Sequence, residues 1–382
     1  MPASGRFYFD WDNHRTMLRV VKQHPDPKTR RALTGALTVV VPATAAVHAV
    51  CFALDPLLFP ALRRTEVRRP VFNIAHARSG TTYLHRIMAK DPQFSSLLAY
   101  EMFFPSLLEK RVLHGLLAID KALGSPVKRR IQEAEAKALA ATNDAHQTGL
   151  FEPEEDDFLL TFSLGSGLWI AFLPYMAQFD FYHVDRWSPR KRKRVMRFYE
   201  ECLRRQLVLT GAPTHLSKNP TFTGRVESLI EAFPDARFIV PMRNPTETIP
   251  SALKLLQTSW ERSGADPADV QESLRLLAEQ SYHAYRHPLE VLEAHPESLR
   301  CVVDYRDLIA DPAGTVERVY KELELEPAPE VLAGLRAKKQ NAHDTTHHYS
   351  LEEFGLDRDE IVEQLGDLFE KYGWTTEGEQ VS

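Results

Sequence analysis

A short strand, a tight turn and a helix follow one another at residues 71–88, and this unit constrains the fold more than any other feature. Residues 71–75 form an apolar run of strand length, and residues 84–88 carry apolar side chains at helical spacing. The turn between them contains Arg78, Ser79, Gly80, Thr81 and Thr82. The first amides of such a helix have no partner within it, and the helix dipole favours negative charge there. The unit therefore predicts an anion-binding turn, with a purely structural turn as the alternative.

Two residues of this turn fit an anion directly. Gly80 lets the backbone approach a ligand closely, and Arg78 adds a permanent positive charge. The loop that binds nucleoside triphosphates needs two glycines five residues apart and a lysine before Ser or Thr. This chain has no glycine at the required place upstream of Ser79 and no lysine before Thr81. A nucleoside triphosphate is therefore not the expected ligand.

A second strand–helix unit begins at residue 237. The apolar strand 237–240 is followed by Arg243, Asn244 and Pro245, and Ser251 lies eight residues after Arg243 in the next helix. An arginine and a hydroxyl placed in this way can hold a phosphate through charge-assisted hydrogen bonds. Ligands of open α/β sheets collect at the carboxyl ends of the strands. Together the two units predict a nucleotide with two separated anionic ends.

With these motifs the sequence resembles the sulfotransferase superfamily, and especially its bacterial-type branch with an RSGTT loop. The resemblance covers about residues 70–375 and includes four further segments: 152–156, 218–220, 304–312 and 348–355. It implies that the donor is 3′-phosphoadenosine 5′-phosphosulfate (PAPS), that adenosine 3′,5′-bisphosphate is released, and that no metal is required. It places residues 78–82 at the 5′-phosphosulfate, and Arg243 and Ser251 at the 3′-phosphate.

The order of expected elements predicts an α/β fold. Strands at 214–218, 237–240 and 300–304 alternate with helices, which indicates a parallel central sheet flanked by helices. By resemblance this is the P-loop-like sulfotransferase fold. We expect a core domain at 66–375 with a mostly helical insertion at about 105–210, preceded by a helical and apolar extension at 1–65.

Transfer of a sulfuryl group depends on in-line positioning and on stabilisation of charge more than on a metal. By resemblance and position, Arg78 should neutralise charge on the bridging oxygen. Lys218, at a strand end, should hold the transferring sulfuryl group. The alternative for Lys218 is an ordinary surface lysine.

The acceptor hydroxyl also needs a general base. Many members of the family carry a histidine two residues after the Lys-x-Pro proline, but this chain has Phe222 there. Glu101, which follows the first core helix, is the first candidate. The alternatives are His146, Glu152 and Glu154.

Histidines near the end of the chain raise the question of a metal. His343, His347 and His348 are not accompanied by cysteines or carboxylates at metal-ligand spacing, so no metal site is expected. A place near the nucleotide is the preferred interpretation for His347 or His348.

The segment 32–60 is unusually apolar, with an almost charge-free run at residues 32–54. As a helix it is long enough for the hydrocarbon core of a bilayer, but Pro42 and His48 interrupt it. This favours a buried or interfacial helical hairpin over a true span, with peripheral membrane contact as a further prediction. The basic run 190–194 is interpreted as a solvated helix face that could also meet anionic headgroups or an anionic acceptor.

Charge and cysteine content restrict the class of protein. A net charge of −5 gives no sign of nucleic-acid binding, and three widely spaced cysteines argue for a reducing compartment without a disulfide framework. No secretory signal is visible, so we expect a cytoplasmic protein, with a place at the membrane surface as the alternative.

The sequence thus predicts a PAPS-dependent sulfotransferase that acts on a hydroxyl of a small-molecule, lipid or carbohydrate acceptor. One alternative is a nucleotide-dependent phosphotransferase. The other is a catalytically inactive, membrane-associated nucleotide-binding protein. The oligomeric state is left open.

Overall fold

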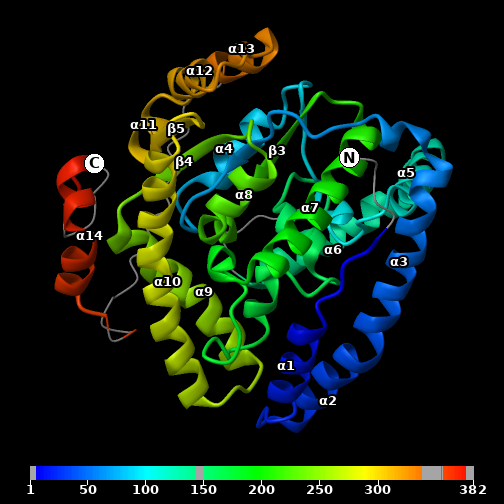
Figure 1. Cartoon of the computed structure of the whole chain (residues 1–382), viewed down its shortest axis with the longest axis horizontal. Helices are drawn as coiled ribbons and strands as arrows, with labels where there is room; N and C mark the ends of the chain where they lie inside the picture. The colour runs from blue at the N-terminus through cyan, green and yellow to red at the C-terminus, as the bar shows by residue number, and fades with distance from the viewer. Residues whose placement is uncertain (1–5, 143–148, 338–353, 355, 376–382) are drawn as a thin grey trace.

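The computed structural model describes residues 6–142, 149–337, 354 and 356–375. Its centre is a five-stranded parallel sheet in the order β2-β3-β1-β4-β5, with helices on both faces (Figure 1). The strands are β1 (Val71–Asn73), β2 (Phe94–Ser95), β3 (Thr214–Lys218), β4 (Arg237–Met242) and β5 (Leu299–Asp304). This architecture confirms the expected α/β fold class.

The register of the three central strands brings the site residues to one edge of the sheet. Asn73 at the end of β1 pairs with Lys218 of β3 on one side and with Ile239 of β4 on the other. Because the three strands are parallel, their carboxyl ends meet at the same edge. The turn after β1, Lys218 and the turn after β4 therefore lie side by side.

Successive side chains of each strand point to opposite faces of the sheet, and they pack into two hydrophobic cores, one on each face. Phe72, Phe238 and Val240 enter the larger core, whereas Val71 and Ile239 enter the smaller one. Every residue of β1 and β4 is buried, as expected for a parallel sheet covered on both sides. The strands that carry the site turns therefore sit on a rigid, fully packed support.

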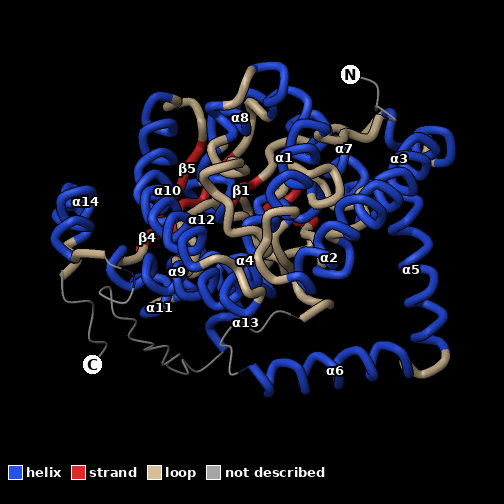
Figure 2. The backbone as a smooth tube through the Cα atoms, turned by 90° about the horizontal axis from the view of Figure 1, so that it is seen from below, coloured by secondary structure: helices blue, strands red, loops and turns tan. Residues whose placement is uncertain are grey.

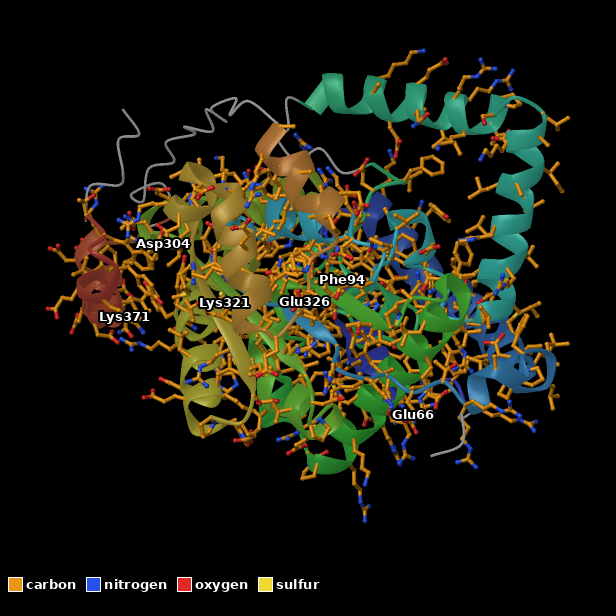
Figure 3. All side chains as sticks on the ribbon, turned by 90° about the horizontal axis from the view of Figure 1, so that it is seen from above. Glu66, Phe94, Asp304, Lys321, Glu326 and Lys371 are labelled. Carbon is orange, nitrogen blue, oxygen red and sulfur yellow. The ribbon has the colours of Figure 1, made fainter. Side chains whose placement is uncertain are left out.

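Helices follow the strands. They are α4 (Thr81–Met88), α8 (Val226–Ala232), α9 (Pro245–Arg262), α10 (Pro267–Ala294), α11 (Tyr305–Ala310), α12 (Pro312–Glu322), α13 (Pro329–Ala337) and α14 (Arg358–Tyr372). Side-chain caps begin several of them. Asn244 accepts from the Thr246 amide at the start of α9, and Asp304 accepts from the Arg306 amide at the start of α11. Asp304, labelled in Figure 3, ends β5 at the carboxyl edge of the sheet.

The long connection between β2 and β3 contains α5 (Leu107–Ala122), α6 (Pro126–Thr142) and α7 (Pro189–Thr210), together with short 3₁₀ turns. Helix α7 is buried along its inner face and joins the larger core. Helices α5 and α6 instead form an arm at the edge of the molecule (Figure 2). The basic run on α7 is partly engaged within the protein, since Lys191 pairs with Asp10, and Arg192 with Glu231.

The N-terminal region comprises α1 (Trp11–Val21), α2 (Pro27–Gly35), a π-helical turn (Ala36–Val40) and α3 (Val41–Leu58). From residue 27 to 58 these form one continuous helix, so the expected hairpin is wrong. Pro42 lies in the first turn of α3, directly after the π-helical turn, where its missing amide hydrogen does not break the helix. The region also packs into the larger core, through α1 and the inner face of α3.

Candidate active site

The turn after β1 adopts the backbone of an anion nest. Arg78 and Gly80 both have positive φ, of 70° and 85°, and α4 begins at the next residue. A Cβ atom on Gly80 would lie 2.7 Å from Cδ2 of Tyr305, so no other residue fits without a shift. The Asn73 side chain donates to the Thr81 carbonyl over 3.0 Å, which ties the turn to the end of β1. The turn is thus held open for a ligand by its neighbours.

The structure brings the two predicted anion sites into contact. Nε of Arg78 donates to the Ser251 hydroxyl over 3.1 Å, and Arg243 donates to the Arg78 carbonyl over 3.3 Å. Both arginines are half-buried and keep part of their surface toward solvent. The predicted phosphosulfate turn and the predicted 3′-phosphate residues therefore form one continuous cationic surface.

The second arginine is oriented by several neighbours. The guanidinium of Arg243 stacks over the Tyr305 ring at 4.3 Å and pairs with Glu247 over 2.7 Å. The Tyr285 hydroxyl donates to the Arg243 carbonyl over 2.7 Å and also contacts Thr248. These contacts fix the position of the guanidinium, and an anion that binds it through Nε and Nη2 would have to take the place of the Glu247 carboxylate.

Lys218 is buried at the end of β3, which excludes the surface-lysine alternative. Its ammonium nitrogen lies 3.0 Å from Glu155, 3.3 Å from Glu154 and 3.4 Å from the Thr82 hydroxyl. Burial by itself would lower the pKa of Lys218, but the two carboxylates outweigh burial and raise that pKa above its ordinary value. Burial also raises the pKa of Glu155, and Lys218 offsets part of that rise. Lys218 is therefore a charged ammonium next to the turn.

A buried hydrogen-bond network fixes the acidic segment 154–157 against β3. Asp156 accepts from the hydroxyls of Tyr199, over 2.6 Å, and Ser217, over 2.9 Å, and lies 2.9 Å from Nε2 of His215. Burial opposes ionisation of Asp156, yet these hydrogen bonds outweigh burial and lower its pKa. The network determines where the carboxylates of Glu154 and Glu155 meet Lys218.

Glu101, the first candidate for the general base, has a different set of hydrogen-bond partners. Glu101 is buried, and its carboxylate accepts from the Leu98 amide and from the Gln206 side chain, at 3.1 and 3.0 Å. Its second oxygen lies 2.6 Å from Nε2 of His114. The partners recorded for this carboxylate include neither Arg78 nor Lys218 within the described part of the chain.

The other candidates for the general base differ in their contacts and exposure. Glu154 touches both Lys218 and, over 3.5 Å, Arg86 of α4, whereas Glu152 is exposed. Phe222 is buried in the core, which fits its lack of any acid–base role. His146, His343, His347 and His348 lie outside the described residues.

Sequence reasoning missed three residues of the site. Glu155 stood inside the acidic run but was not singled out, although it is the carboxylate nearest Lys218. Tyr285 lies in the middle of α10, a helix without any motif, so the sequence carries no signal for it. Tyr305 follows the β5 strand within the 304–312 segment, and only its position in that segment could have suggested it. In the described ranges no group of three or more metal-ligating side chains is arranged to hold a metal ion.

Comparison with known proteins gives a consistent result. The model of the sulfotransferase family matches residues 70–330 of the chain. Two curated relatives, each named omega-hydroxy-beta-dihydromenaquinone-9 sulfotransferase Stf3, come from Mycobacterium bovis and Mycobacterium tuberculosis. Each is 27% identical to this chain over 314 residues, which is 80% of this chain and 75% of the relative.

Solved structures agree in fold. The crystal structure of sulfotransferase STF9 from Mycobacterium avium superposes with a TM-score of 0.74, at 21% identity, covering 98% of this chain and 95% of that one. Sulfotransferase STF1 from Mycobacterium tuberculosis gives a TM-score of 0.62, at 21% identity, covering 94% of each chain. These likenesses extend over the N-terminal helices as well as the sheet.

Proposed function

The chain belongs to the sulfotransferase family, and on this premise we propose that it transfers a sulfuryl group from PAPS to a hydroxyl of a lipidic acceptor. The observation that carries the proposal is the contact of Arg78 with both Ser251 and Arg243. This contact joins a nest for one anionic group to an oriented arginine for a second. A donor with phosphates on both sides of one ribose has such a pair of anionic ends.

The residues fit this donor in chemical terms. The backbone amides of residues 79–82 suit a phosphosulfate, because amides at a helix N-terminus point at the ligand and the dipole favours negative charge. Arg243 and Ser251 would hold the 3′-phosphate. When bound, PAPS supplies the sulfuryl group and a good leaving group, so the protein has to supply position and charge.

Lys218 and Arg78 would provide the charge stabilisation. Both lie beside the turn, and Lys218 is held between Thr82 and the carboxylates of Glu154 and Glu155. The carboxylates neutralise the ammonium in the buried site. An incoming sulfuryl group would compete with them for Lys218, which would release a carboxylate near the reacting centre.

Of the two carboxylates that contact Lys218, we propose Glu154, which was an alternative in the sequence, as the general base in place of the first candidate, Glu101. Replacing Glu154 with glutamine should lower kcat by about 10²–10⁴-fold, because general-base catalysis contributes about that much. Binding of adenosine 3′,5′-bisphosphate should change little. Steady-state kinetics and calorimetry would measure the two effects separately.

The matched variant Glu101→Gln should act mainly on stability. The buried Glu101 carboxylate makes three polar contacts, so the loss of its charge should lower the melting temperature while kcat stays within a few fold. If Glu101→Gln instead abolished turnover without changing the melting temperature, the base would be Glu101.

The lipidic acceptor rests on the relatives and on the apolar helix. The two mycobacterial relatives are named for a hydroxylated dihydromenaquinone, and this chain exposes an apolar segment at residues 32–60 that could contact a membrane. A carbohydrate acceptor is the alternative within the same chemistry.

The test is incubation of the purified chain with ³⁵S-labelled PAPS and separate lipid and carbohydrate extracts. We expect label in an organic-soluble product, formed equally well in the presence of EDTA. Label in the carbohydrate fraction would change the acceptor class. Tight binding of PAPS without product from either extract would identify an inactive binding protein, and turnover with ATP and Mg²⁺ would identify a phosphotransferase.

A further inference from the structure

The continuous helix at residues 27–58 is apolar on two opposite faces. Its inner face packs into the protein through Val41, Ala45, His48, Phe52 and Asp55. Its outer face is exposed and contains Val40, Ala43, Val47, Val50, Leu54 and Leu57. The outer residues follow one another at three- and four-residue spacing, so they form a single stripe. Val50 is 61% exposed and Leu57 is 69% exposed, which is a large apolar area to leave in water.

Helix α5 carries a second stripe of the same kind. Val112, Leu116, Ile119 and Leu123 lie four, three and four residues apart and are all exposed, up to 72% for Leu123. Val127 continues the exposed apolar surface into α6. Nothing in the sequence pattern of residues 105–210 had singled out this stripe.

Polar contacts join the two helices into one unit. Asp55 of α3 caps the start of α5 by accepting from the amides of Leu107 and Leu108, at 2.9 and 2.8 Å. His48 of α3 lies 2.7 Å from Glu109 of α5. Figures 1 and 2 show α3 and α5 along the same edge of the molecule, and Figure 3 shows α5 and α6 standing clear of the body.

The surroundings of this apolar edge are basic, although the whole chain carries a net charge of −5. Between Arg31 and Arg63 the only Asp, Glu, Lys or Arg is the buried Asp55. Exposed cationic residues flank the two helices: Lys28, Arg31, Arg63, Arg64, Arg111, Lys121, Arg129 and Arg130. Cations next to exposed apolar side chains are the combination that binds anionic lipid surfaces.

We propose that the two stripes form a docking face, made of Val40, Ala43, Val47, Val50, Leu54 and Leu57 together with Val112, Leu116, Ile119 and Leu123, which lies in the interface of an anionic bilayer. A second copy of the chain fits this face less well. A symmetric dimer would bring two copies of the same basic surface together, and like charges repel.

The helix lies along the membrane instead of crossing it. By length and composition residues 27–58 could span a bilayer. However, Asp55 on the inner face pairs with Arg205 of α7 over 2.7 Å, and both side chains are completely buried. Arg205 also stacks over the Phe52 ring. Moving the helix across a membrane would separate Asp55 from Arg205 and bring an unpaired carboxylate into the bilayer, at a prohibitive cost, while Arg205 would keep its second partner, Glu201.

The docking face adds to the proposed function, since it would bring the enzyme to the membrane that holds a lipidic acceptor. That connection rests on the proposed function. Membrane binding itself requires neither donor nor acceptor. A test of binding alone therefore separates the two inferences.

The experiment is co-sedimentation of the full chain with vesicles, in the absence of PAPS. One set is pure phosphatidylcholine, and in the other half of the lipid is phosphatidylglycerol. We expect binding to the anionic vesicles that weakens as salt is raised. The single variants Leu57→Glu and Leu116→Glu should each reduce the partition coefficient at least tenfold, about the loss from exposing one buried leucine. Arg63→Gln and Arg64→Gln should each reduce it about fivefold.

Leu255→Glu is the matched control. Leu255 is an exposed leucine of α9, away from the docking face, so its replacement should leave vesicle binding unchanged. All these positions are exposed, and melting curves would verify that the variants fold. Absence of binding to anionic vesicles, or equal binding by Leu57→Glu and wild type, would overturn the proposal. A dimer in light scattering that Leu57→Glu converts to monomer, without vesicle binding, would assign the face to a second copy.

Discussion

At the scale of single residues, Arg243 shows how the site is prepared before a ligand arrives. Its guanidinium is stacked on Tyr305 and paired with Glu247, while its carbonyl is held by Tyr285. A side chain fixed in this way loses little conformational freedom on binding, so more of each hydrogen bond appears as affinity. The Glu247 carboxylate also balances the charge of this guanidinium.

Replacing Arg243 with alanine should weaken binding of adenosine 3′,5′-bisphosphate by about 10–100-fold. Hydrogen bonds to charged groups contribute about 1.5–3 kcal/mol, and this variant removes a bidentate donor. Isothermal titration calorimetry measures the change. Arg275→Ala is the control, since Arg275 makes comparable ion pairs with Glu272 and Glu279 on the exposed side of α10. Unchanged affinity in Arg243→Ala would show that the second phosphate binds elsewhere.

Residues that stand in a local motif could be singled out from the sequence, and residues that reach the candidate site through the fold could not. Arg78, Gly80 and Arg243 each stand in a strand–turn–helix unit whose chemistry is visible in a few consecutive letters. Tyr285 reaches the site from α10, and its role depends on how that helix packs beside α9. Glu155 could be told from Glu154 only once β3 had placed Lys218.

At the scale of elements, the turn between β1 and α4 is the most constrained piece of backbone. Gly80 combines a positive φ with the ring of Tyr305 directly beside its Cα. The same ring supports Arg243. One tyrosine at the start of α11 therefore shapes both halves of the proposed donor site.

Gly80→Ala should destabilise the protein by about 1–3 kcal/mol, because an alanine at positive φ is strained and its methyl group meets Tyr305. Binding of adenosine 3′,5′-bisphosphate should fall with it. Gly35→Ala offers a control of the same chemistry, since Gly35 is helical and its Cβ would meet open space. That change should stabilise the protein by about 0.5–1 kcal/mol. Chemical denaturation measures the change in unfolding free energy of both variants. Equal changes at the two glycines would contradict the special constraint on Gly80.

Long elements with a clear pattern were predicted more closely than short or ambiguous ones. The strands at 214–218 and 299–304 agree with the expected positions within a residue. Strand β2 was not predicted, because two residues are too few to show the alternation of apolar and polar side chains that marks a strand. The apolar helix at 27–58 was taken for a hairpin, because Pro42 normally ends a helix and a π-helical turn that absorbs it has no sequence signature.

At the scale of the whole molecule, burial encloses several histidines, and two of them, His76 and His85, lie close to the turn after β1. His76, before the turn, lies 2.9 Å from the Ser281 hydroxyl and stacks on Tyr285. His85, on α4, is completely buried, and neither ring nitrogen has a hydrogen-bond partner among the described residues. Burial lowers the pKa of His76 to about 4 and that of His85 to about 3.

These histidines predict that stability falls as the pH drops below about 6.5. In the unfolded chain both take up a proton near that pH, whereas the folded protein keeps them neutral, so acid favours unfolding. At pH 5 the loss should be about 2 kcal/mol for each histidine relative to neutral pH. Urea denaturation at pH 7 and pH 5 measures it. His85→Gln should reduce the difference by about 2 kcal/mol, and an unchanged difference in that variant would exclude His85 as one of its sources.

The buried pair of Asp55 and Arg205 has a consequence for synthesis on the ribosome. The two residues are 150 positions apart in the chain. At about 5–20 residues per second, Arg205 is made on the order of 10–30 s after Asp55. During that interval the apolar segment has left the ribosome, while the helix that completes its burial does not yet exist. The nascent chain must therefore be shielded from aggregation for that time, and the unpaired Asp55 opposes its insertion into a bilayer until α7 arrives.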